Sequence, residues 1–347
     1  MRDFIRLLSL ILLVISLTAC KKEKQPETYT EVPETPRYLA AADGKLYVSC
    51  YREPACVARI DTTTLRVEAC CRLGNYQPEG MAIANGKLFV ASSWISDERG
   101  NILRDNKVYV IDLSTFKVIS TITVGLNPQR VEALDGTHVV VNYLGDYGST
   151  PSGSCIIDAT TLDVKPTGQE MTGLCSVGGL VFAYVAPYGS PTVNFFYLNP
   201  TTLDTTHILT NVSVSYPYGI RVIGGDIFIT TGPYNANGDV YRYGADGTLK
   251  WQCEAGVFVN KVETVGDGTA YVLSEGSWGA SNASLDRVNL ATGQITNNVF
   301  SAANGRNLGD IAQDILVYGS KAYVTVSFSN TIEAVNIKDN KSTQIAL

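Results

Sequence analysis

The chain has 347 residues, of which 45% are apolar and only 17% are charged, and it contains 31 Gly and 19 Tyr. This balance is typical of a compact domain built from many strands and turns. The 27 basic and 33 acidic side chains leave a net charge of −6. A chain without a basic footprint is not expected to bind nucleic acid.

The first 20 residues have the pattern of an export signal. Arg2 and Arg6 precede an apolar stretch, Leu7 to Leu17, that is too short to span a bilayer. The stretch is followed by Thr18-Ala19-Cys20, and the segment resembles a bacterial lipoprotein signal, which implies that Cys20 is lipidated. An ordinary secretory signal with an incidental Cys is the alternative.

The signal is followed by a polar, Pro-containing segment without periodicity. We therefore expect a signal peptide over 1–20, a flexible tether over 21–35 and one folded domain over 36–347. Lipid on Cys20 would tether that domain to the cell envelope, at the outer membrane.

One pattern occurs seven times after the tether. Its marker is a Gly turn followed by an aromatic or β-branched run: GKLYV from Gly44, GKLFV from Gly86, GTHVV from Gly136, GLVFA from Gly179, GDIFI from Gly225, GTAYV from Gly268 and SKAYV from Ser320. Successive markers lie 42 to 52 residues apart, and a second motif such as VARIDTTTLRV from Val57 repeats in phase. The sequence predicts an all-β, seven-bladed β-propeller of four-stranded antiparallel blades, as a monomer.

The seventh blade contains all four of its strands, so the ring does not need a strand from the N-terminus. We expect closure by packing between blades one and seven. An extra edge strand formed by Thr28 to Val32 is the alternative.

The phase of the repeat predicts two different faces. Tight turns such as Asp43-Gly44 and Asn85-Gly86 all emerge on one face. The opposite face receives the loops between second and third strands and those between blades, with insertions over 92–106, 145–154, 232–238 and 275–281. Loops of variable length on a fixed scaffold usually carry binding, so we place the site on this loop-rich face.

Aromatic side chains are frequent in these loops. The residues expected to contact a ligand are Trp94, Tyr147, Tyr188, Tyr234 and Trp278. Aromatic rings with a polar tip can stack on flat or sugar-like ligands. The alternative is that such rings fill gaps between blades, and we expect this for about half of the aromatic loop residues. Other aromatic residues in these loops are Tyr51, Tyr143, Phe258 and Phe328.

A ring of polar residues is predicted where the innermost strands begin. The seven are Arg37, Glu79, Gln129, Thr172, Tyr218, Asn260 and Gln313, and the charged residues beside them are Arg130, Lys261 and Asp314. Because innermost strands line the axial channel, we expect this set to surround its mouth. Solvated strand ends around a water-filled channel are the alternative.

The cysteines fit an exported protein. A symmetric hairpin around Thr62 to Thr64 would place Cys56 opposite the Ala69/Cys70 step, which favours a Cys56–Cys70 disulfide. The odd count of seven cysteines after Cys20 leaves at least one free thiol, with buried apolar packing expected for Cys175 and Cys253. No Cys-x-x-Cys pair or Cys/His cluster occurs, so no metal site is predicted.

Catalytic residues are not predicted. The only histidines, His138 and His207, have no partner at a suitable spacing. Carboxylates near the loop-rich face (Glu79, Asp146, Glu275 and Asp314) leave a glycosidase, lactonase or lyase as a third hypothesis. We expect no cofactor.

The GKLYV and IDTTTLRV phrases resemble the YVTN/YncE-like seven-bladed propellers over about residues 36 to 347. With the lipoprotein signal, the chain is also similar to Bacteroidetes propeller lipoproteins, including surface corrinoid-capture proteins that sit on TonB-dependent transporters. Lys21-Lys22-Glu23-Lys24 departs from the acidic run common in surface lipoproteins, so the surface and the periplasmic face both stay open.

The resemblance implies a non-catalytic binding protein that captures a small molecule or glycan, such as a cobamide, for a TonB-dependent receptor. A protein-interaction scaffold that uses the same face is the alternative. Capture requires a concave pocket with side chains from several blades, whereas a scaffold requires a flatter apolar patch.

Overall fold

The computed structural model describes residues 34–52, 55–74, 76–97, 99–186, 193–209, 214–345 and 347. The predicted signal, Cys20, and the tether up to residue 33 lie outside this range, as does Tyr188. In the described part of the chain, no helix has the length and apolar character needed to cross a bilayer.

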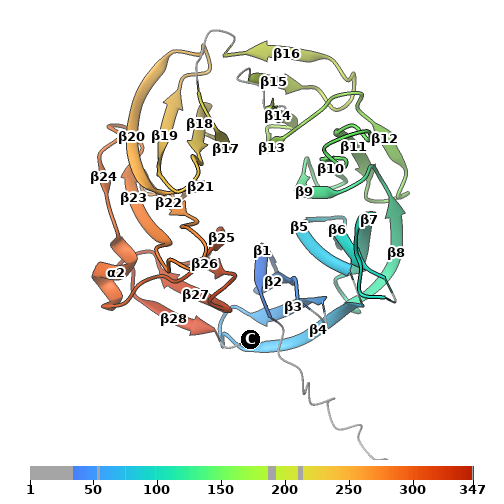
Figure 1. Ribbon diagram of the computed structural model, residues 1–347, viewed down its shortest axis with the longest axis horizontal. Coiled ribbons are helices and arrows are strands. Elements are labelled where there is room, and N and C mark those ends of the chain that lie inside the picture. Colours follow the sequence, from blue (N-terminus) through green and yellow to red (C-terminus); the bar gives the residue numbers. More distant parts are fainter. Residues whose placement is uncertain are drawn as a thin grey trace, which may run out of the picture. The chain divides into compact units, whose positions relative to one another are not determined.

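The described residues form seven four-stranded antiparallel sheets arranged as blades around a central axis, which confirms the predicted propeller (Figure 1). Blades one and two comprise β1 (Pro36–Ala42), β2 (Lys45–Cys50), β3 (Ala55–Asp61), β4 (Val67–Gly74), β5 (Tyr76–Ala84), β6 (Lys87–Ser96), β7 (Ile102–Asp112) and β8 (Lys117–Thr123). Blade three comprises β9 (Pro128–Ala133), β10 (His138–Tyr143), β11 (Gly153–Asp158) and β12 (Val164–Pro166), and blade four β13 (Gly173–Val177), β14 (Leu180–Val185), β15 (Asn194–Leu198) and β16 (Thr205–Ile208).

The last three blades have the same order. They comprise β17 (Pro217–Ile223), β18 (Asp226–Thr231), β19 (Asn237–Tyr243) and β20 (Leu249–Val257), then β21 (Val259–Thr264), β22 (Thr269–Ser274), β23 (Ser284–Asn289) and β24 (Ile295–Thr296), then β25 (Ala312–Tyr318), β26 (Lys321–Val326), β27 (Thr331–Asn336) and β28 (Ser342–Ile345). A short helix, α2 (Val299–Asn304), which the sequence analysis did not predict, lies between blades six and seven. All of these sheets lie within residues 36–345, so a fragment that begins at Glu27 contains the whole propeller.

The apolar core lies between neighbouring blades. Fully buried Phe89 of blade two and Val141 of blade three belong to one such cluster, and Tyr323 of blade seven packs with Leu46 and Ile60 of blade one. Each alternating strand thus buries side chains on both faces of its sheet, against the blades on either side.

Blade seven is built from four consecutive strands, as expected. Besides the apolar cluster, hydrogen bonds join it to blade one: the Leu39 N–H donates to Asp314 Oδ2 at 3.0 Å, Thr325 Oγ1 to the Arg37 carbonyl at 2.5 Å, and Ser327 Oγ to the Pro36 carbonyl at 2.6 Å. Among the described residues, packing and side-chain hydrogen bonds close the ring. Residues 28–32 lie outside them.

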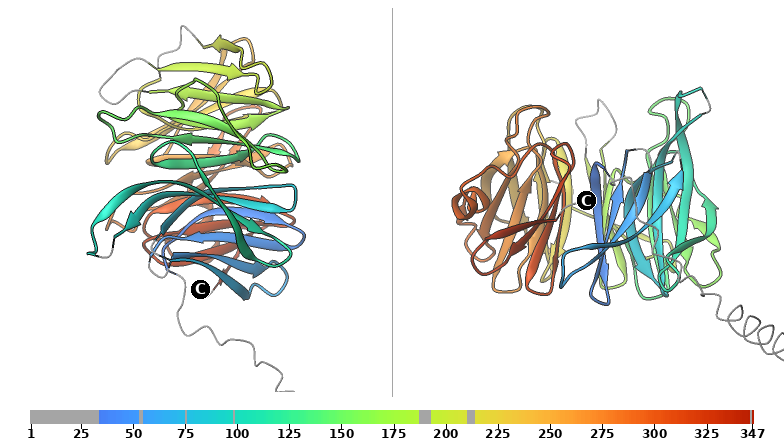
Figure 2. Two further views of the ribbon diagram at one scale, coloured as in Figure 1. Left: turned by 90° about the vertical axis from the view of Figure 1, so that its right-hand side faces the viewer. Right: turned by 90° about the horizontal axis from the view of Figure 1, so that it is seen from below.

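The second and third strands of blade two are longer than predicted. Much of the expected loop over 92–106 is instead a continuation of β6, which ends at Ser96, and of β7, which begins at Ile102, with Trp94 paired opposite Arg104. Alternating residues here can still pair as strands, so the insertion extends the sheet. The hairpin extends outward from blade two on this side (Figure 2).

The register expected for Cys56 is wrong. Arg72 lies opposite Cys56, while Cys70 lies opposite Ala58. The hairpin is not symmetric, because Leu65 adopts a left-handed conformation in the turn and the register shifts between Arg59 and Ile60. Cys56 and Cys70 are free thiols in the structure, and their disulfide stays a prediction.

Six of the seven innermost strands contain a β-bulge where they begin. The register with the second strand shifts between Pro36 and Leu39, Pro78 and Met81, Pro128 and Val131, Pro217 and Gly219, Val259 and Lys261, and Ala312 and Asp314. A bulge interrupts the alternation of side chains and can re-aim a residue. These bulges coincide with six of the seven positions of the predicted polar ring.

Buried polar residues of the second strand satisfy the backbone at four of these bulges. Ser49 accepts from the Tyr38 N–H at 3.0 Å, Asn142 from Arg130 at 2.8 Å, Thr230 from Gly219 at 2.9 Å and Thr325 from Asp314 at 3.0 Å. An unpaired buried amide would cost about 1–3 kcal/mol. A single polar side chain in an apolar strand therefore stabilises each of these irregular strand starts.

Candidate functional site

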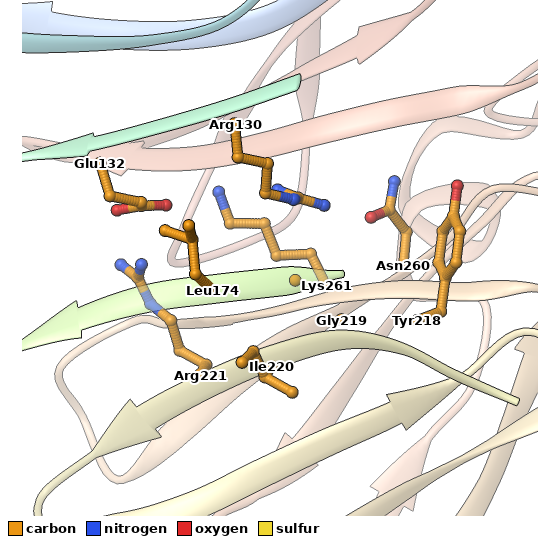
Figure 3. A pocket seen from close by; sticks show the side chains of 10 residues that line it. Arg130, Glu132, Leu174, Tyr218, Gly219, Ile220, Arg221, Asn260 and Lys261 are labelled. Carbon is orange, nitrogen blue, oxygen red and sulfur yellow. The ribbon is translucent and has the colours of Figure 1, made fainter. Parts of the chain in front are cut away.

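The axial channel contains a cavity lined by side chains and backbone from all seven blades. Its wider part, with a volume of about 150 Å³, is lined by Tyr38, Leu39, Gly80, Met81, Arg130, Val131, Glu132, Arg221, Lys261, Asp314 and Leu316. An adjoining part adds Gly173, Leu174, Tyr218, Gly219, Ile220 and Asn260 (Figure 3). The cavity is polar and carries charges of both signs.

The bulges explain how this wall is built. Asn260 and Lys261 are consecutive, yet both line the cavity, because the register of β21 shifts between Val259 and Lys261. On β17, Gly219 allows close approach of the neighbouring blade: a Cβ at this position would lie 2.0 Å from the Asn260 carbonyl oxygen. The backbone geometry at the strand starts thus sets the shape of the channel mouth.

Five of the predicted residues come together at the cavity: Arg130, Tyr218, Asn260, Lys261 and Asp314. Gln129, Thr172 and Gln313 do not line it. The Gln129 side chain donates to Asn127 Oδ1 at 2.7 Å, Thr172 Oγ1 accepts from the Ala186 N–H at 2.9 Å, and Gln313 is buried with its carbonyl accepting from Asn260 Nδ2. The bonds of these three residues are to their own neighbours, and their part in ligand binding stays a prediction.

Arg37 and Glu79 form an ion pair between blades one and two. Two nitrogens of the guanidinium donate to the same Glu79 oxygen, at 3.0 and 2.9 Å, and Ser93 Oγ donates to the other oxygen at 2.9 Å. The guanidinium also lies 5.0 Å from the ring centre of Tyr51. Burial raises the pKa of Tyr51 to about 12, so its hydroxyl stays protonated at neutral pH.

Two further pairs surround the cavity. Lys261 Nζ lies 2.9 Å from Asp314 Oδ1, and the Tyr218 hydroxyl donates to Glu275 Oε2 at 2.9 Å. Burial raises the pKa of the Glu275 carboxyl, and the hydrogen bond from Tyr218 opposes that effect only in part. Tyr218 is further held by the ring of Phe258, edge-on at 4.7 Å between ring centres.

Sequence reasoning missed three charged residues of the channel. Glu132 and Arg221 line the cavity, and Glu263 lies behind it, 3.5 Å from Arg221 and 3.8 Å from Lys261. The signal for all three in the sequence is a charge inside an otherwise apolar innermost strand. For Glu132 and Glu263, a second charge lies two residues earlier, in Arg130-x-Glu132 and Lys261-x-Glu263.

Exposed aromatic rings lie in the loops of the loop-rich face. The exposed fractions of Tyr147, Tyr234 and Trp278 are 62%, 86% and 79%. Trp278 pairs with Phe328, which is 50% exposed, at 6.1 Å between ring centres. We call these four residues the aromatic rim. Trp94 is half-buried and is therefore not counted in the aromatic rim.

Trp94 and Tyr147 both contact one guanidinium. Arg104, which the sequence analysis did not select, lies 4.2 Å from the ring centre of Trp94 and 4.8 Å from that of Tyr147. Tyr147 has a left-handed backbone, φ 60°, in a turn held by Asp146, which accepts from the Gly148 and Thr150 N–H groups at 2.8 Å each. These contacts fix the position of the two rings before any ligand arrives.

The carboxylates considered for catalysis all have partners within the protein. Glu79 pairs with Arg37, Asp146 holds its own turn, Glu275 accepts from Tyr218, and Asp314 pairs with Lys261. Within the described ranges, no group of three or more His, Cys, Asp and Glu residues could hold a metal ion.

Comparison with known proteins establishes the fold but no family. No family model matches the sequence, and no curated protein matches it. Among solved structures, hydrazine synthase of Kuenenia stuttgartiensis is similar with a TM-score of 0.68 at 14% identity, over 91% of this chain and 99% of that one.

Two further structures show the same fold at lower similarity. The computationally designed Ika8 protein gives a TM-score of 0.56 at 8% identity, covering 90% and 83% of the two chains. The uncharacterized protein lmo1340 from Listeria monocytogenes EGD-e gives 0.55 at 10% identity, covering 91% and 97%. Identities this low are evidence for a shared propeller architecture alone.

Proposed function

We propose that this protein is a non-catalytic binding protein of the cell envelope that captures a ligand on its loop-rich face. The observation that carries the proposal is the convergence of all seven blades on one polar cavity beneath the aromatic rim. Capture needs such a concave site with side chains from several blades. Tethering by lipid on Cys20 is the part of the proposal that rests on the sequence.

The rim favours a ligand with flat or sugar-like surfaces. Tyr234 and Trp278 expose most of their ring surface, and Tyr147 is held in place by Arg104. Stacking on such rings needs little change in the protein, because they are attached to short, hydrogen-bonded loops. A small molecule or glycan is the proposed ligand class, and a cobamide, handed on to a TonB-dependent receptor as in Bacteroidetes corrinoid-capture lipoproteins, is its most specific version.

A protein-binding scaffold is the second candidate. The Trp278–Phe328 pair is the observation that favours it, because two adjacent exposed rings can anchor a protein partner. The two hypotheses differ in where binding would be lost. Capture involves both the rim and the cavity, whereas a scaffold needs the rim alone.

Isothermal titration of the fragment from Glu27 onward with cyanocobalamin tests the cobamide version. We expect a Kd in the micromolar range or below, and heat that is lost in the W278A and Y234A variants. L249A is the matched control, because Leu249 is 48% exposed and lies on β20 at the outer edge of blade five. The cobamide version is wrong if cyanocobalamin gives no heat at micromolar concentrations.

A thermal-shift panel of other cobamides and oligosaccharides tests the broader ligand class. A ligand of the rim should raise the unfolding temperature of the wild type and not of W278A. If the whole panel leaves the unfolding temperature unchanged, the scaffold hypothesis is favoured.

A further inference from the structure

Arg130 differs from the other cations of the channel in having no ionic partner. Arg37 pairs with Glu79, Lys261 with Asp314, and Arg221 lies 3.5 Å from Glu263. Within the described part of the chain, the Arg130 guanidinium forms no ion pair and donates no hydrogen bond. The guanidinium lies 5.7 Å from the ring centre of Tyr38, and the charges of Asp314 and Glu132 act on it without forming a direct ion pair.

The nearby carboxylates are already used by other groups. Asp314 accepts from Lys261 and from the N–H groups of Leu39 and Ile315. Glu275 accepts from Tyr218, and Glu132 lies on the other side of Arg130 from the mouth (Figure 3). Arg130 therefore keeps all five of its N–H donors free inside the channel.

A guanidinium in this position needs an acceptor. Buried polar groups are normally hydrogen-bonded, and a half-buried charge without a partner is costly. The planar fork of Arg matches the two oxygens of a carboxylate and forms two parallel, charge-assisted bonds with it. In Figure 3 the guanidinium is directed toward Asn260 and Tyr218, the residues at the start of their strands and hence at the mouth of the channel.

We propose that Arg130 binds a carboxylate group of the captured ligand, which favours an acidic small molecule or glycan over cyanocobalamin, whose side chains are amides. The volume of about 150 Å³ compares with about 30 Å³ for one water molecule, so the cavity admits a carboxylate-bearing arm while the body of the ligand lies on the aromatic rim. Arg130, Lys261 and Arg221 are balanced by Glu132, Asp314 and Glu263. The free donors of Arg130, and not an excess of positive charge, therefore select the carboxylate.

This inference rests on the proposed function, and its test uses 4-fluorobenzoate with the neutral isostere 4-fluorobenzamide. Both are followed by fluorine NMR on the fragment from Glu27 onward. We expect the carboxylate to bind about tenfold more tightly than the amide. The R130Q variant should abolish this preference, and R130K, which keeps the charge but loses the fork, should retain only part of it.

Arg66 provides the matched control. It is exposed in the turn between β3 and β4 on the opposite face, so R66Q removes the same charge and should leave the preference intact. The unfolding temperature of R130Q reports on folding, and no decrease is expected because an unpaired charge is removed.

Equal affinity for the two probes, no binding of the carboxylate at about 10 mM, or an unchanged preference in R130Q would overturn the role of Arg130. Binding of both probes that is lost in W278A but insensitive to R130Q would refute this inference while supporting capture on the rim. The inference is supported if the carboxylate preference is lost in R130Q and retained in R66Q.

Discussion

Arg37 and Glu79 lie on the innermost strands of adjacent blades, and the guanidinium donates two hydrogen bonds to a single carboxylate oxygen. The Glu79 side chain is only 3% exposed, whereas that of Arg37 is 21% exposed. Removing Arg37 and removing Glu79 therefore have different consequences for the residue that remains. Glu79 would be left as a buried anion, but Arg37 keeps its aromatic neighbours Tyr38 and Tyr51 and some contact with water.

We predict that R37M lowers the free energy of unfolding by about 3 kcal/mol, because it leaves the Glu79 carboxylate buried without its cation. E79Q should cost less, and the double variant R37M/E79Q should regain most of the loss. Urea unfolding of the four proteins measures these values. Additive effects of the two substitutions would show that the ion pair does not couple them.

The bulge at the start of blade five gives a second prediction. Thr230 Oγ1 accepts from the Gly219 N–H at 2.9 Å in a buried position. T230V keeps the shape but leaves this amide unpaired, and we expect a loss of about 1–3 kcal/mol in the free energy of unfolding.

Thr206 is the control for this substitution. It lies exposed on β16, and T206V should change stability by less than about 0.5 kcal/mol. Equal effects at the two positions would mean that the hydrogen bond at the bulge contributes nothing measurable.

The sequence predicts the seven blades, the loop-rich face and five residues of the cavity, because each depends on a repeated pattern. It does not predict the bulges, since these depend on pairing with the neighbouring strand. Gln129, at one of these bulges, was expected to face the channel, but its side chain donates to Asn127 Oδ1. Arg104 was also missed, because only the extension of β6 and β7 places it between Trp94 and Tyr147.

Glu275 should make stability depend on pH. Burial raises the pKa of its carboxyl in the folded protein, so the folded state binds a proton more tightly than the unfolded state does. The resulting stabilisation is fully present below the unfolded value of about 4.3 and is lost as the pH rises through the raised value.

E275Q keeps an acceptor for Tyr218 but does not titrate. We therefore expect the unfolding free energy of the wild type, relative to E275Q, to fall as the pH rises above the unfolded value and through the raised pKa of Glu275. Chemical unfolding at a series of pH values measures this difference. E170Q, at an exposed position, is the control, and the same trend in both variants would contradict the role of Glu275.

The Cys56–Cys70 disulfide remains testable in material exported to an oxidising compartment. The Cys56 thiol interacts with those of Cys50 and Cys70, and its pKa is raised chiefly by the hydrogen bond with Cys50. We expect peptide mapping without reductant to link Cys56 to Cys70. Reduction should lower the unfolding free energy by about 3 kcal/mol, the value for a loop of some 15 residues. A Cys50–Cys56 link would show that the adjacent register pair is preferred.

Seven similar blades around an axis would offer a ligand seven nearly equivalent orientations. The hairpin of β6 and β7 breaks this rotational symmetry, because it extends outward from blade two on the loop-rich face (Figure 2). With Arg104 between the rings of Trp94 and Tyr147, one sector of the circle is chemically unlike the rest. A ligand held in the channel only through its carboxylate would be free to rotate about the channel axis. Contact with this sector would restrict it to one orientation.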